Sequence, residues 1–263
     1  MVEAGLGLYA IAIPAGLLVL LSVAEYLWPR NVRVLGRVPR WRTHALFFLT
    51  NAAVGRLLAL LVVVSSAAAW ANGHGYGLFN HVGWPWWLEA GLAFILLDFA
   101  LWLQHVAMHR FGFLWAMHKV HHSDRDLDAS TALRFHPLEL LVSTLYKSAC
   151  VVFLGVPVLV ALAFELWLNC NALFNHSNVR LPRSVDRLLR IFLVSPDMHL
   201  VHHSTNVGEQ KRNYGFALTW WDRLFATYAY ESTMGRDGQA IGLAEIADER
   251  PTLFLWSIKQ PLT

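Results

Sequence analysis

Three short segments of this chain carry histidines at the spacing of a helix face. They read His105-x-x-x-His109, His118-x-x-His121-His122 and His199-x-x-His202-His203. Residues three or four positions apart lie on the same face of an α-helix, so each segment, called a histidine box here, can direct two or three imidazoles toward one point. Imidazole suits iron, zinc, copper and nickel. Because one ion takes about four to six ligands, eight such histidines predict two metal ions close together.

Other residues near the boxes are candidates for the same site. His176, between the second and third boxes, is a further candidate ligand, and His136 is either another ligand or a neighbour of the site. Asp98 lies within an apolar run, where an acid is costly and usually functional, and it recurs at helical intervals with the first box. We expect Asp98 either to orient a histidine or to pair with Arg56.

Further motifs accompany the boxes in order. Asn175-His176-Ser177 precedes the third box, and Asn213-Tyr214-Gly215 and Trp221-Asp222-Arg223-Leu224-Phe225 follow it. Taken in this order, the boxes and motifs resemble the fatty acid hydroxylase and sterol desaturase superfamily of integral-membrane di-iron oxygenases. The resemblance covers about residues 90–230, and the ordered set is far more specific than any single box.

The resemblance implies which residues bind the metal. The implied ligands are His105, His109, His118, His121, His122, His176, His199, His202 and His203. Fatty acid 2-hydroxylases have a His-x-x-x-His before their last box, and here that spacing falls on Asn171 and Asn175, which we expect beside the ligands. No Ser/His/Asp or Cys/His arrangement and no Gly-rich phosphate loop is apparent, so no catalytic residue is predicted beyond the ligands.

The resemblance also implies the chemistry. Two irons with O₂ as co-substrate would hydroxylate or desaturate a C–H bond of a lipid that enters from the bilayer. No haem or flavin domain is visible in the chain, so the electrons would come from a separate donor, such as a b-type cytochrome, a ferredoxin or a reductase. A basic cytoplasmic face would attract an acidic redox protein.

The composition is that of a membrane protein. Hydrophobic residues make up 56% and charged residues 15% of the 263 residues, and the mean hydropathy is +0.41, which is too apolar for an ordinary soluble domain. The twelve tryptophans fit interfacial belts. We therefore predict an all-α membrane bundle, forming one domain over residues 1–263, with a cytoplasmic helical cap that carries the boxes. The net charge of +3 comes mainly from arginines beside apolar runs and indicates topology, not nucleic-acid binding.

Four apolar runs set the expected topology: 6–28, 45–71, 86–104 and 138–168. The first is expected to span the membrane with a kink at Pro14, and the five arginines of 29–42 mark the cytoplasmic side. The boxes are then expected on the cytoplasmic face. The lack of organelle signals and the compact form favour a bacterial inner membrane over the endoplasmic reticulum, which stays an open alternative. The run 138–168 is shorter than the roughly 40 residues of two spans, so it predicts a tilted or partly inserted hairpin that breaks at 155–157.

Two local features lie outside the apolar runs. Asp124, Asp126 and Asp128 follow the second box and are expected on a solvated face. Ser195-Pro196-Asp197 is expected to cap the helix of the third box.

Two other functions remain open at this point. A membrane carrier for metal or haem would also need many histidines, but its ligands would lie along the spans and on both membrane faces. A zinc-dependent membrane hydrolase would need three protein ligands and a nearby carboxylate base, and no box contains the Glu of His-Glu-x-x-His. The particular lipid, the choice between hydroxylation and desaturation, and the oligomeric state are left open by the sequence.

Overall fold

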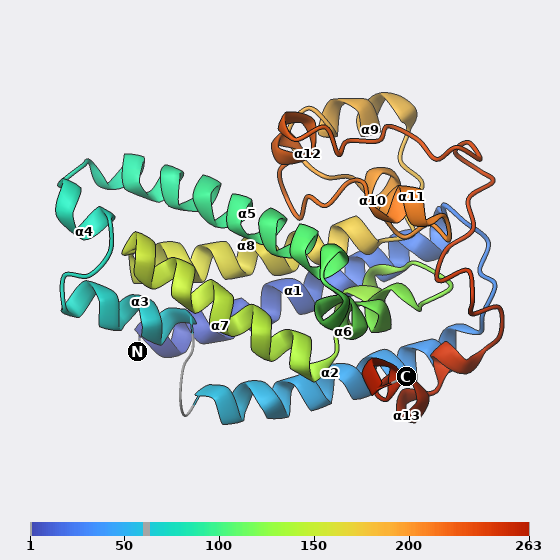
Figure 1. Cartoon of the computed structure of the whole chain (residues 1–263), viewed down its shortest axis with the longest axis horizontal. Coiled ribbons are helices and arrows are strands. Elements are labelled where there is room, and N and C mark those ends of the chain that lie inside the picture. Colours follow the sequence, from blue (N-terminus) through green and yellow to red (C-terminus); the bar gives the residue numbers. More distant parts are fainter. Residues whose placement is uncertain (1, 60–63, 263) are drawn as a thin grey trace.

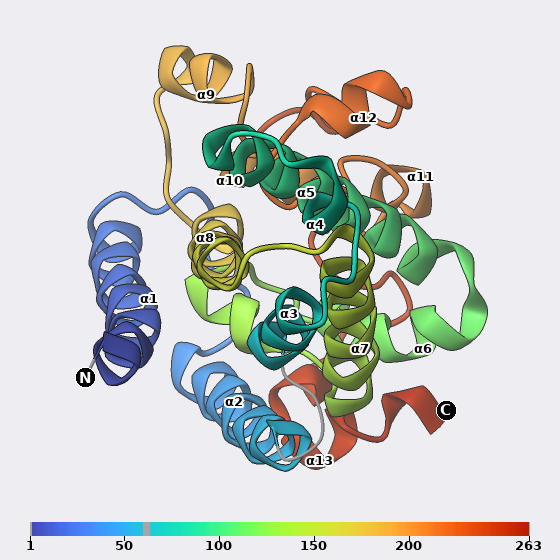
Figure 2. The same cartoon turned by 90° about the vertical axis from the view of Figure 1, so that its left-hand side faces the viewer.

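The computed structural model describes residues 2–59 and 64–262, which form helices and loops. The long helices are α1 Val2–Leu27, α2 Arg37–Ala59, α5 Trp86–Arg110, α7 Pro137–Leu154 and α8 Val158–His176. They run roughly side by side and form an elongated bundle (Figure 1). Seen along the bundle, α1 lies on an outer side next to α8 (Figure 2), and these two helices are in contact.

Shorter helices connect the long ones or cover one end of the bundle. They are α3 Val64–Gly73, α4 Phe79–Val82, α6 Gly112–His122, η1 Ala129–Leu133, α9 Arg183–Leu189, α10 Pro196–His202, α11 Val207–Gln210, α12 Trp220–Leu224, η2 Arg250–Thr252, α13 Phe254–Ser257 and η3 Gln260–Leu262. Helices α9 to α12 gather at one end of the long helices, and α4 lies at the opposite end (Figure 1).

Four helices in the described part of the chain are long and apolar enough to cross a membrane. They are Tyr9–Leu27, Trp86–Arg110, Pro137–Leu154 and Val158–His176. Their surfaces expose large apolar side chains such as Ile11, Leu20 and Phe153, which a bilayer would cover. These findings confirm the prediction of an all-α membrane bundle. Helix α1 continues on both sides of Pro14.

The apolar run at 45–71 does not form the single span that we expected. It is divided between α2 and α3, and residues 60–63 lie outside the described part of the chain. Neither helix qualifies as a membrane span, because α2 begins eight residues before the run and takes in three further arginines, while α3 has only 10 residues. Helix α3 packs against α7 and α8, where Ala68 and Ala71 are fully buried and allow a close approach.

The predicted hairpin is confirmed, and its break lies where the sequence indicated. Helix α7 ends at Gly155, which has a φ of 70°, and Pro157 precedes α8. A side chain on Gly155 would collide with the backbone of Tyr76, which crosses the turn. Both helices are long enough to span, so the expected partial insertion is not required. The apolar run underestimated the length of the second helix of the hairpin. Helix α8 continues through polar residues to His176, beyond the predicted end at 168.

Candidate metal centre

The nine histidines that the sequence singled out lie in two groups. The first group contains His105, His109, His118, His122 and His202, and the second contains His121, His176, His199 and His203. Within each group, the candidate ligand atoms all lie within 4.8 Å of one another. The groups are neighbours, because the rings of His122 and His203 stack with their centroids 4.3 Å apart.

Each His-x-x-His-His box serves both groups. In α6, the second box gives His118 and His122 to the first group and His121 to the second. Around α10, the third box does the reverse, giving only its middle histidine, His202, to the first group. A helix turns by about 100° per residue. Around the helix axis, position i+4 therefore lies about 40° from position i in one direction, and position i+3 lies about 60° from position i in the opposite direction. The boxes therefore aim at two adjacent points, and not at one point each as the spacing alone suggested.

Outward hydrogen bonds orient most of these rings. The Nδ1 atoms of four histidines lie beside backbone carbonyls, with His105 against Tyr214 at 2.7 Å, His121 against Arg134 at 3.3 Å, His176 against Ala172 at 2.6 Å and His202 against Arg212 at 2.8 Å. A carbonyl only accepts, so each Nδ1 carries the proton and donates. The Nε2 lone pair of each ring is then left to face the interior of its group.

Glu139 does the same for a fifth histidine. The Nδ1–H of His118 donates to Glu139 Oε1 at 2.7 Å. A carboxylate behind a metal-binding imidazole fixes its tautomer and raises its basicity. The sequence analysis missed this residue. The available signal was an acid in the first turn of a helix that begins soon after the second box.

The inward atoms meet as metal ligands would. The Nε2 atoms of His105 and His118 are 3.2 Å apart, and His176 Nε2 lies 2.9 Å from His121 Nε2 and 3.1 Å from His199 Nε2. Where both rings of a pair carry their proton on Nδ1, two lone pairs face each other and repel unless a cation lies between them. Neighbouring nitrogens bound to one ion at 2.0–2.1 Å are themselves about 3 Å apart. The donor set therefore fits two metal ions.

Burial keeps these imidazoles in the form that binds metal. Burial, followed by repulsion from neighbouring histidines, holds the pKa of His121, His122, His199 and His203 well below its usual value. For His202 the same causes lower the pKa to about 3. The rings are therefore neutral at physiological pH, which leaves a nitrogen lone pair free for coordination.

Three of the other predicted residues have partners outside the two groups. His136 caps α7, since its Nδ1 accepts from the Leu138 amide at 3.1 Å, and its Nε2 lies 3.1 Å from the Ile258 carbonyl. The amide nitrogens of the two asparagines donate to backbone carbonyls, Asn171 to Trp167 and Asn175 to Phe216.

Asp98 follows neither of the two alternatives that we expected. Its Oδ2 accepts from Trp221 Nε1 at 2.8 Å and from the Leu218 amide at 3.3 Å. It therefore ties α5 to α12 and to the segment that leads into it, instead of orienting a histidine or pairing with Arg56, whose side chain is exposed.

Asp222 connects the two motifs that follow the third box, Asn213-Tyr214-Gly215 and the one that begins at Trp221. Its carboxylate is fully buried and accepts from the amides of Tyr214 and Gly215 at 2.9 and 2.8 Å and from Trp102 Nε1 at 3.0 Å. The carbonyl of Tyr214 is the group that orients His105. One aspartate therefore fixes the loop that positions a histidine of the first group.

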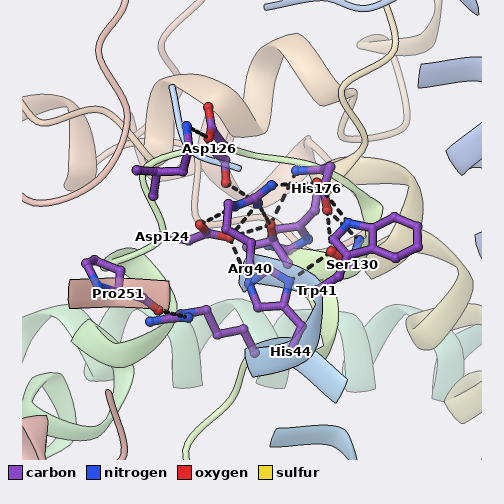
Figure 3. Close-up of polar contacts among 12 residues, drawn as sticks. Arg40, Trp41, His44, Asp124, Asp126, Ser130, His176 and Pro251 are labelled. Atoms are coloured by element: carbon purple, nitrogen blue, oxygen red, sulfur yellow. Dashed lines mark hydrogen bonds and ion pairs between the residues drawn. The ribbon is translucent and has the colours of Figure 1, made fainter. Parts of the chain in front are cut away.

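The acidic trio after the second box is buried and not on a solvated face. Asp124 and Asp128 are fully buried, and Arg40 of α2 joins them (Figure 3). Arg40 Nε and Nη2 donate to the two oxygens of Asp124 at 2.8 and 2.7 Å, and Nη1 donates to Asp128 at 2.7 Å. Burial alone would raise the pKa of Asp124, but the guanidinium outweighs it and holds the pKa well below its usual range.

Helix α1 also contacts the segment that follows the second box, through Glu25. Glu25, in its last turn, accepts from the amides of Ala129 at 2.7 Å and Asn178 at 3.1 Å. These amides belong to the loops that follow the second box and His176. Helix α1 therefore holds both segments, while Arg40 of α2 holds the one after the second box. Ser195 caps α10 as predicted by accepting from the Met198 amide.

A cavity of about 280 Å³ opens beside His105 and His118. It lies between α2, α5, α7 and α8, and its wall is mainly apolar, with Leu101, Met108 and Phe216 among the lining side chains. A second cavity of about 260 Å³ adjoins His109 and Trp115 and has a more polar wall. The first group of histidines is thus reached from two sides, and one of these cavities lies between helices that include three candidate membrane spans.

Comparison with known proteins agrees with this geometry. The chain is 29% identical to human alkylglycerol monooxygenase over 209 residues, which are 75% of this chain and 43% of the relative. It is 29% identical to the ornithine lipid hydroxylase OlsE of Rhizobium tropici (55% and 43% covered) and 30% identical to methylsterol monooxygenase 1 of Danio rerio (55% and 48% covered). The chain spans less than half the length of these relatives. No solved structure gives a significant match.

The family match covers all nine histidines of the two groups. The fatty acid hydroxylase model matches residues 90–227, which is more than half of the chain. This stretch contains all three boxes, His176 and the Asp222 motif. The chain belongs to the fatty acid hydroxylase family.

Proposed function

We propose that this protein is a membrane di-iron oxidoreductase that uses O₂ to hydroxylate or desaturate a C–H bond of a lipid. The observation that carries the proposal is the pair of converging imidazole groups, the first of which lines an apolar cavity through His105 and His118. The proposed ligands are the nine histidines of the two groups. Neutral imidazole suits iron, and two bound irons would supply the oxidising power that an unactivated C–H bond requires.

The chain's own residues have three roles in this proposal. The outward Nδ1 partners, including Glu139 for His118, keep each Nε2 lone pair directed into its group. The apolar wall of the cavity holds the hydrocarbon part of the substrate beside His105 and His118 and excludes water. The Asp222 and Arg40 networks hold the loops that carry the histidines, so the geometry is set before substrate enters.

A lipid substrate is supported by the relatives and by the cavity. The relatives are named for alkylglycerol, ornithine lipid and methylsterol, which are all lipids. The cavity lies between helices that include three candidate spans, so a lipid can reach it without leaving the bilayer. We propose lipid hydroxylation as the principal reaction, because these relatives are named hydroxylases or monooxygenases.

We place the histidine groups on the cytoplasmic side of a bacterial inner membrane. Basic residues beside a span favour that side, and Arg33 and Arg37 follow α1 at the same end of the bundle as the loops after the second box. A separate protein, such as a b-type cytochrome, a ferredoxin or a reductase, would supply the electrons.

The test is metal analysis followed by oxygen incorporation. Protein purified in detergent and loaded anaerobically with ferrous iron should hold about two irons per chain that are magnetically coupled in Mössbauer spectra. With ¹⁸O₂, a chemical reductant and lipid nanodiscs, a lipid product should carry the label. His118→Ala and His199→Ala should lose iron and product, whereas His81→Ala, an exposed histidine outside both groups, should keep them.

Other outcomes would contradict the proposal. A single zinc per chain with ester or amide cleavage would favour the hydrolase alternative. Transport of metal or haem that survives the single alanine substitutions would favour the carrier.

A further inference from the structure

Two buried acceptor atoms in the wall of the apolar cavity beside His105 and His118 have no hydrogen-bond donor in the described part of the chain. They are Glu139 Oε2 and Asn51 Oδ1. Glu139 is only 5% exposed and uses its other oxygen for His118. The Asn51 amide nitrogen donates to the Phe135 carbonyl at 2.9 Å. Since a carbonyl cannot donate, this contact establishes which amide atom is oxygen.

No described residue around the cavity donates a hydrogen bond to either atom. Most of the lining side chains are apolar. Another polar pair at the cavity is already satisfied, because Ser143 Oγ donates to Gln104 Oε1 at 3.4 Å. A buried acceptor without a donor costs free energy, and native structures leave few of them. Two of them at one cavity therefore indicate a bound molecule that brings its own donor.

We infer that Glu139 and Asn51 bind a hydrogen-bond donor of the lipid, a hydroxyl or an amide N–H, beside His105 and His118. This inference rests on the proposed function and narrows its substrate class to lipids with such a donor near the reacting carbon. The apolar wall then holds the hydrocarbon chain. Because Glu139 contacts both His118 and the lipid, it sets the position of the donor relative to the first histidine group.

The test compares two lipids that differ only in this donor. Hexadecanol and hexadecyl methyl ether have the same chain, but only the alcohol can donate. Their affinities are measured by displacement of radiolabelled hexadecanol from the full chain loaded with zinc, which occupies the histidines without turnover. A hydroxyl that donates to a carboxylate should favour the alcohol by roughly tenfold to a hundredfold. Equal affinities in the unmodified protein would overturn the inference, since water would then be the donor.

Two substitutions test the two acceptors separately. Asn51→Leu removes one acceptor at similar size and should reduce the preference for the alcohol several-fold. Glu139→Gln keeps an oxygen for His118 but presents an amide N–H₂ in place of Oε2, so the preference should fall or reverse in favour of the ether. Ser143→Ala is the matched control, because its hydroxyl already has a partner, and should keep the preference. A full preference in both acceptor variants would overturn the inference.

These outcomes remain distinct from those of the proposed function. Binding is measured without iron or oxygen, so a protein that failed to incorporate ¹⁸O₂ would still show the preference. Conversely, equal binding of the two lipids would leave oxygen incorporation unaffected. Metal content of each variant, measured in the same samples, shows whether Glu139→Gln has also disturbed His118.

Discussion

His121 and His122 are neighbours in the sequence, yet they belong to different histidine groups. Such a division is visible only in three dimensions, because the sequence shows the same helical spacing in both boxes. Eight of the nine histidines could be identified from their helical spacing, which is a local property, and His176 from the motif Asn175-His176-Ser177. Glu139 and Glu25 were missed, because a single acid gives no spacing pattern and their partners become apparent only when separate helices meet.

The division predicts different consequences for two adjacent substitutions. His121→Ala leaves the second group with three of its four histidines and should remove about one metal ion per chain. His122→Ala leaves the first group with four of five and should weaken binding there while the second group stays filled. Metal per chain, measured after graded dialysis against a chelator, checks both. Loss of both ions in His121→Ala, with none lost in the exposed control His81→Ala, would mean that the groups do not fill separately.

Asp222 provides a second prediction at this scale. Asp222→Asn keeps one acceptor oxygen but replaces the other with a donor that faces a backbone N–H. The unfolding free energy should fall by about 1–3 kcal/mol, and the first group should bind metal more weakly because the loop behind His105 loosens. Thermal melting and metal titration test this. Asp248→Asn, at an exposed position, is the control and should change neither.

At the scale of elements, the sequence predicted correctly the features that depend on neighbouring residues. It did not predict those that depend on contacts between residues far apart in the chain. The Gly-Val-Pro break gave the α7–α8 hairpin correctly, because the turn depends on residues within it. The acidic trio was misjudged because its partner, Arg40, lies 84 residues before Asp124. The extent of α2 was misjudged as well, since an apolar run does not indicate that a helix starts earlier among arginines.

The α2 contact predicts a large effect from one substitution. Arg40→Met removes the cation between two buried carboxylates, which should destabilise the protein by about 3–5 kcal/mol. Arg42→Met, two residues away on an exposed position, should change stability by less than about 0.5 kcal/mol. Thermal unfolding in detergent measures both. Arg40→Met combined with Asp124→Asn should recover part of the loss, and no recovery would mean that the pair does not act as a unit.

At the scale of the whole molecule, the bundle has two unlike ends. One end carries α9 to α12, and the other carries α4 and the loop before it (Figure 1). If the end that carries α9 to α12 is cytoplasmic, His74→Cys at the α4 end should react with a membrane-impermeant maleimide on intact cells. Asp248→Cys, on the segment that follows the cap, should react only after the membrane is opened. Both positions are exposed, and the reverse labelling pattern would invert the orientation. The unmodified protein controls for Cys150 and Cys170.

The way that α6 and α10 each supply both groups also has a mechanical consequence. A rotation of α10 about its axis that drew His202 toward the first group would carry His199 and His203 away from the second. Under such a rotation one group would tighten while the other loosened, so the spacing of two ions bound as proposed would follow the pitch of the two helices. Helical pitch varies little, because it is set by backbone hydrogen bonds. In the proposed di-iron form, the peptide backbone of α6 and α10 would therefore set the distance between the two metals.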